Sequence, residues 1–144
     1  MKKALKISSL FLAVLFFFAW TPVQGQAPDF EGTWEITWET LTGDTRSFTV
    51  TLEKQGRIIL GMAQLPMGIF TEEQSEGMEE VGLTHGDTHG HIATFHVHPT
   101  TPGSMDDQVI ALYAAVGDER MEGYMTGVMP DPATAVPFVG VKRY

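Results

Sequence analysis

The sequence of 144 residues contains no cysteine. This absence excludes disulfide bonds, cysteine-based metal clusters, a thiol nucleophile and a lipid-modified N-terminal cysteine. Basic residues are also scarce, because nine lysines and arginines stand against 18 aspartates and glutamates, a formal net charge of −9. So acidic a chain has no basic patch to displace the counterions of a phosphate backbone. A nucleic acid is therefore not an expected partner.

Long apolar runs are missing except near the N-terminus, where Leu10–Trp20 follows a start that contains three lysines. This run is too short to span a bilayer, which takes about 20 residues in a helix. The small-residue site Val23–Gly25 follows it. The order predicts a secretory signal peptide over residues 1–25, with an uncleaved membrane anchor as the alternative. Residues 26–144 are then one periplasmic or extracellular domain without a membrane span.

Apolar and polar residues alternate with period two in much of the remaining chain, which is typical of half-buried strands. Trp34, Ile36 and Trp38 show this pattern first. Strands are predicted over Thr33–Thr40, Ser47–Glu53, Ile58–Gln64, Glu80–Thr84, His89–His98, Gln108–Val116, Met121–Met129 and Val136–Lys142. One short polar segment, Thr71–Glu79, is a candidate helix. The pattern predicts an all-β fold, an eight-stranded antiparallel up-and-down barrel, with a two-sheet sandwich as the alternative.

Two ends of the domain resemble a known family. The stretch Phe30–Ile36, with its Gly-Thr-Trp, resembles the first strand of lipocalin-like (calycin) barrels, in which Gly-x-Trp begins the barrel. Gly117–Gly127 resembles a penultimate hairpin and Pro137–Arg143 a closing strand. The chain is thus similar to small secreted bacterial barrels, a family that also occurs as modules fused to amidohydrolases. The resemblance implies a lipocalin-like fold and no particular activity, because such folds host carriers, inhibitors and some enzymes.

Four residues are candidates for an apolar binding site inside this barrel: Trp38, Phe95, Tyr113 and Met125. An eight-stranded barrel has room for core side chains or for one small ligand. The first functional hypothesis is therefore a binding module for a small, largely apolar molecule. Trp34 is expected to be plain core, and methionines on one strand face are expected to fill the interior and not to bind Cu(I).

All five histidines fall between positions 85 and 98, and neutral imidazole binds Zn, Cu and Ni well. If Gly86-Asp87-Thr88 forms a hairpin loop, His85 lies across from His89, with His91 on the same face. The second hypothesis is therefore a Zn or Cu site made by His85, His89 and His91, with Asp87 as an outer partner, in a metal-binding protein or metal-dependent enzyme. Exposed histidines without a ligand are the alternative.

His96 and His98 are expected on the opposite face of their strand from Phe95 and Val97. Glutamates crowd the stretch Glu72–Glu80, which is expected to form a solvated loop over one barrel mouth. The sequence contains no nucleophile elbow, phosphate loop or metalloprotease helix motif, so no catalytic residue is assigned. The third hypothesis is an accessory barrel that supports a partner protein and holds no small ligand. Any special chemistry is expected at one mouth, between Glu72 and His98.

Overall fold

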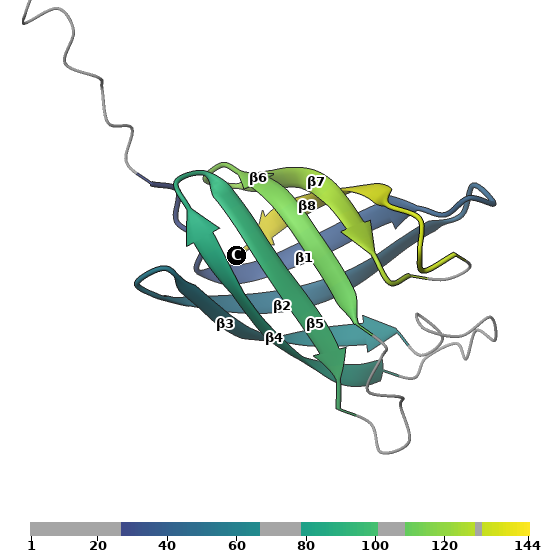
Figure 1. Ribbon diagram of the computed structural model, residues 1–144, viewed down its shortest axis with the longest axis horizontal. Helices are drawn as coiled ribbons and strands as arrows, with labels where there is room; N and C mark the ends of the chain where they lie inside the picture. The colour runs from purple at the N-terminus through teal and green to yellow at the C-terminus, as the bar shows by residue number, and fades with distance from the viewer. Residues whose placement is uncertain (1–26, 67–78, 101–108, 129–130) are drawn as a thin grey trace, which may run out of the picture.

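The computed structural model describes residues 27–66, 79–100, 109–128 and 131–144, and these residues form a closed antiparallel barrel (Figure 1). Its strands are β1 (Gly32–Glu39), β2 (Thr45–Gln55), β3 (Ile58–Pro66), β4 (Glu79–His89), β5 (Ile92–Pro99), β6 (Ile110–Val116), β7 (Arg120–Thr126) and β8 (Val136–Arg143). Each strand pairs with the next in the sequence, and β8 returns to pair with β1. The predicted eight-stranded up-and-down barrel is confirmed, and the two-sheet alternative is wrong.

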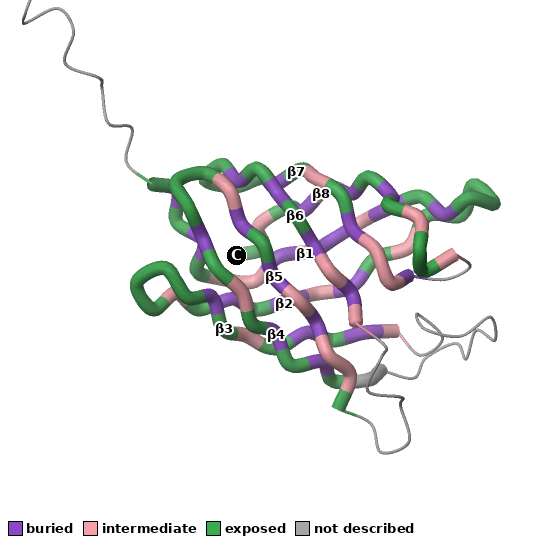
Figure 2. Tube along the Cα trace, viewed as in Figure 1, coloured by how far each residue is buried: buried purple, intermediate pink, exposed green. Residues whose placement is uncertain are grey.

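Along the strands, buried residues that face the interior alternate with more exposed residues on the outer face of the barrel (Figure 2). In β2, Phe48, Val50 and Leu52 are buried, while the intervening threonines and Glu53 are exposed or half-buried. The register of β1 on β8 runs from Thr33 opposite Arg143 to Trp38 opposite Phe138. Because this pair closes the sheet on itself, none of the eight described strands has an edge free for pairing with another chain.

The turns between β1 and β2 and between β2 and β3 lie in the gaps between the predicted strands. Thr40 N–H donates to the carbonyl oxygen of Asp44 at 2.8 Å across the first turn. The second turn contains Gly56, whose φ of +65° lies in the left-handed region that favours glycine. Residues Gln55 and Ile58 pair directly on either side of it.

The predicted turn at Gly86 and Asp87 is wrong. Strand β4 continues through both residues to His89, and the chain turns at Gly90, whose φ is +60°. Gly86 lies within the strand because Phe95 of β5 covers it: a Cβ atom built on Gly86 would lie 2.5 Å from the Cβ atom of Phe95. A glycine inside a strand thus marks a close approach of another residue here and not a turn.

Several sequence-based expectations fall outside the described residues. These are the signal peptide over residues 1–25 and all but the last residue of the candidate helix Thr71–Glu79, since β4 begins at Glu79. Three of the clustered glutamates, Glu72, Glu73 and Glu76, lie there too. In the part of the chain that the structure does describe, no helix is long and apolar enough to cross a membrane.

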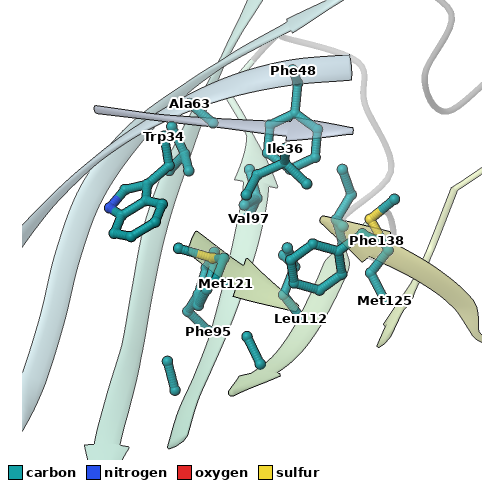
Figure 3. Close-up of a cluster of buried hydrophobic side chains, with 14 of the residues drawn as sticks. Trp34, Ile36, Phe48, Ala63, Phe95, Val97, Leu112, Met121, Met125 and Phe138 are labelled. Atoms are coloured by element: carbon teal, nitrogen blue, oxygen red, sulfur yellow. The ribbon is translucent and has the colours of Figure 1, made fainter. Parts of the chain in front are cut away.

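The barrel interior is packed with apolar side chains (Figure 3). Trp34, predicted to be core, is fully buried, and its indole Nε1 donates to the carbonyl oxygen of Phe30 at 3.0 Å. Lys142 Nζ lies 5.6 Å from the centre of the Trp34 ring and 3.2 Å from the Asp29 carboxylate. Phe30 itself is 1% exposed, so the segment before β1 closes the interior at the end where β1 begins.

Candidate functional site

Three of the four residues proposed to line an interior site do face the interior. Phe95 of β5 is fully buried, and Met125 and Trp38 are 1% and 3% exposed. The Trp38 ring meets the ring of Phe48 edge to face, with 5.8 Å between ring centres. These side chains form a continuous apolar wall, which packing alone also explains.

The expectation that Tyr113 faces the interior is wrong. Its side chain is 57% exposed on the outer face of β6, where it pairs across the sheet with the equally exposed Tyr124 of β7. The neighbouring residues Leu112 and Ala114 point inward instead. The sequence of β6, Ile-Ala-Leu-Tyr-Ala-Ala-Val, is apolar at nearly every position, so its pattern does not show which residues face inward.

Arg46 of β2 is an inward position that the sequence analysis missed. It pairs directly with Trp38 across the sheet and lies in phase with the buried Phe48. The indole Nε1 of Trp38 and the guanidinium Nε of Arg46 are both buried and have no hydrogen-bond partner among the described residues. Two directly paired positions thus each carry a buried N–H donor that has no acceptor in the described part of the chain. A cation in phase with an apolar strand face was the sequence signal for this position.

One more buried donor lies on the interior side of the wall. The hydroxyl of Thr84, a residue 4% exposed on β4, also has no partner within the described part of the chain. The hydroxyl of Thr88, by contrast, donates to the carbonyl oxygen of Arg57 at 3.4 Å. Buried polar groups in native proteins nearly always form a hydrogen bond, so a buried group without one suggests an additional hydrogen-bonding partner.

The structure brings together a different set of histidines from the predicted one. His85 of β4 pairs with His96 of β5, and His98 lies two residues further along the same outer face. The ring centres are 4.9 Å apart for His85 and His98, 5.6 Å for His85 and His96, and 6.4 Å for His96 and His98. The expectation that His96 and His98 lie opposite to Phe95 and Val97 is confirmed, since those two residues are fully buried.

His89 and His91 lie apart from this cluster. His89 ends β4, and His91 lies in the turn with its Nδ1 3.3 Å from the carbonyl oxygen of Val116. His85 and His89 are four residues apart on one strand, which separates their Cα atoms by about 13 Å. The hairpin geometry that was expected to unite His85, His89 and His91 is therefore wrong, because the chain turns at Gly90.

The outer histidine cluster, defined as His85, His96 and His98, lies on the barrel wall and not at a mouth. Within the described ranges, no group of three or more His, Asp or Glu side chains is already arranged to hold a metal ion. An open groove of about 450 Å³ adjoins the cluster and is lined by His85, His96, Asp87 and Thr94, among others. Burial lowers the pKa of His98, and positive charge on His85 and then on His96 lowers it further.

An exposed apolar patch lies beside the histidines on the outer faces of β3 and β4. It consists of Ile58, Leu60, Met62, Val81 and Leu83, which are 39–56% exposed. Met62 pairs with Leu83, and Leu60 pairs with His85, so the patch and the cluster are continuous. Apolar patches on a surface often mark contacts with other molecules. The accessory-barrel hypothesis expects such a patch.

The described residues define the class of the protein as a closed eight-stranded antiparallel β-barrel with an apolar interior. Comparisons with protein-family models, with curated proteins and with solved structures find no match to this chain. Membership of the lipocalin-like family stays a prediction from the sequence.

Proposed function

We propose that this protein is an exported lipocalin-like barrel that binds a small, largely apolar ligand carrying a hydrogen-bond acceptor. The observation that carries the proposal is the pair of buried N–H donors on Trp38 and Arg46, which find no acceptor among the residues that the structure describes. Each buried donor without an acceptor destabilises the folded protein by about 1–3 kcal/mol. A ligand that carries acceptor oxygens would satisfy these donors, and a carboxylate or sulfonate would also neutralise the guanidinium.

The surroundings of the two donors favour an apolar ligand body. Trp38 pairs with Arg46 on one side and with Phe138 of β8 on the other, so the three inward positions are adjacent. Phe138 and Met125 are almost fully buried and lie near each other in the interior (Figure 3). Trp34 and Phe95 are fully buried and already fill part of the interior, so the ligand proposed beside Trp38 is a small molecule.

A fluorescence titration with two matched probes tests this proposal. The probe 1-anilinonaphthalene-8-sulfonate has an apolar body and an anionic acceptor, whereas N-phenyl-1-naphthylamine has a similar body without the sulfonate. We expect saturable binding of one sulfonate probe per chain, weakened about tenfold or more by R46M or W38F. The neutral probe should lose less affinity in the same variants.

R143M is the control for these variants, because Arg143 carries the same side chain on the outer face of β8, where it pairs with Glu35. Its affinity for both probes should equal that of the unaltered protein. Failure of both probes to bind would overturn the proposal and favour the accessory barrel. Equal loss of both probes in R46M would show that the arginine shapes the site without holding the acceptor.

A further inference from the structure

The outer histidine cluster has no part in the proposed interior site. Its three imidazoles come from two adjacent strands, two from alternate residues of β5 and one from the residue of β4 opposite His96. Alternate residues of one strand and their cross-strand neighbour form a compact triangle on one sheet face. We propose that His85, His96 and His98 together bind one divalent transition-metal ion of the class that prefers imidazole, Zn²⁺, Cu²⁺ or Ni²⁺.

The separations of the three rings fit a single ion. An imidazole nitrogen that binds Zn²⁺ lies about 2.0–2.1 Å from the ion, so the centre of its ring lies about 3.2 Å from the ion. At tetrahedral angles, the centres of two such rings are then about 5.2 Å apart. The three observed separations run from 4.9 to 6.4 Å. The ring centres therefore need to move by about 1 Å or less to surround one ion.

The orientation of the rings is what changes on binding. The His85 ring lies at 13° to the His98 ring and at 27° to the His96 ring, so the rings are stacked and their nitrogens do not converge. Rotation about the side-chain torsions turns the lone pairs inward. His85 is exposed and the other two are half-buried, so these rotations do not disturb the packed interior.

The residues paired with the cluster across the sheet place no charged side chain directly beside it. The sheet neighbours on its flanks are Leu60, Leu83 and Ala111, which carry no charge. The nearest carboxylate along β4, that of Asp87, is held 3.0 Å from Arg57 in an ion pair. With three protein ligands, a tetrahedral ion keeps one position open to water or an anion, and the adjoining groove gives access to it.

The site is independent of the proposed ligand site, because the cluster is on the outer face and Trp38 and Arg46 point inward. Isothermal titration calorimetry of the untagged protein with Zn²⁺, and with Mg²⁺ as a control ion, measures it directly. We expect one Zn²⁺ per chain with a Kd of about 1 µM or tighter and no binding of Mg²⁺. H85A, H96A and H98A should each weaken Zn²⁺ binding about 100-fold.

H89A and H91A are the matched controls, since they remove the same side chain from the neighbouring turn. Both should bind Zn²⁺ within about twofold of the unaltered protein. As a second measurement, side-chain nitrogen resonances of His85, His96 and His98 should shift together on addition of one equivalent of Zn²⁺. This spectrum is recorded on the unaltered protein, so it identifies the Zn²⁺ ligands even if an alanine variant does not fold.

Three results would overturn the proposal. These are no Zn²⁺ binding at concentrations up to about 100 µM, equal loss of affinity in the H89A or H91A controls, or resonance shifts confined to one ring of the cluster. None of them affects binding of the sulfonate probe, so failure of the metal site and failure of the interior site are distinguishable.

Discussion

Replacement of Phe95 by alanine is the sharpest test of how the barrel interior is filled. The ring is fully buried and covers Gly86, which has no side chain to fill the space that the ring would leave. Removal of a buried phenylalanine ring costs about 3–5 kcal/mol, because transfer free energy is lost and a cavity remains. For a domain with a stability of about 5–15 kcal/mol, this is a large share of the total.

Urea denaturation followed by tryptophan fluorescence measures the effect. With an m-value of about 1.5–2 kcal/mol/M, the midpoint of F95A should fall by about 2 M while m stays constant. Y113A is the control, because Tyr113 is exposed on the outer face, and its midpoint should change by no more than about 0.3 M.

The same measurement separates packing from ligand binding at this position. A loss below about 1 kcal/mol in F95A, with m unchanged, would refute the view that the ring is packed core. If F95A also weakened the sulfonate probe more than R46M does, Phe95 would belong to the ligand site, as the sequence analysis first placed it.

Two further predictions concern the N-terminal part of the chain. The backbone N–H of Glu31 and then the ammonium group of Lys142 lower the pKa of Asp29, so a carboxyl-detected NMR titration should give a midpoint below 3.8. Because the pKa of Asp29 is lower in the folded than in the unfolded protein, its carboxylate stabilises the fold at pH values above the unfolded-state pKa. This stabilisation is lost as the pH falls through the folded-state pKa. The corresponding pH-dependent loss of stability should be absent in D29N. A midpoint at or above 3.8 would contradict the hydrogen bonds that Glu31 and Lys142 donate to this carboxylate. For the signal peptide, mass spectrometry of the chain recovered outside the cytoplasm should show a first residue of Gln26, and recovery of the uncleaved chain in the membrane would support the anchor instead.

The sequence was informative wherever one face of a strand is apolar and the other polar. Strands β1 and β2 alternate cleanly, so their apolar inward residues follow from the pattern, whereas β2 extends two residues beyond each predicted end and so includes the inward Arg46. In β6 both faces carry small or apolar residues, and the choice between Leu112 and Tyr113 depends on the register set by the neighbouring strands. A shift by one residue reverses every side chain, which is why Tyr113 was misplaced.

The site residues show the same limit. Alternation alone placed His96 and His98 on one face, but their partner on β4 depends on where the hairpin turns. Gly86 and Gly90 each lie next to a histidine, and only packing shows which of them is in the turn. Phe95 covers Gly86, whereas among the described residues beyond its chain neighbours no atom lies within 4 Å of a Cβ atom built on Gly90. The pairing of Trp38 with Arg46 likewise depends on the length of the first turn.

The way in which the barrel closes has a consequence for how it folds. Seven of its strand pairs join neighbours in the sequence, and one pair, β1 with β8, joins the two ends of the domain. Local hairpins form quickly, whereas a contact across the whole chain must first overcome loop-closure entropy. Pairing of Trp38 with Phe138 should therefore come late, and a folding intermediate without it exposes β1 and β8 as open edges. Aggregation during refolding should then depend on how fast this one seam closes.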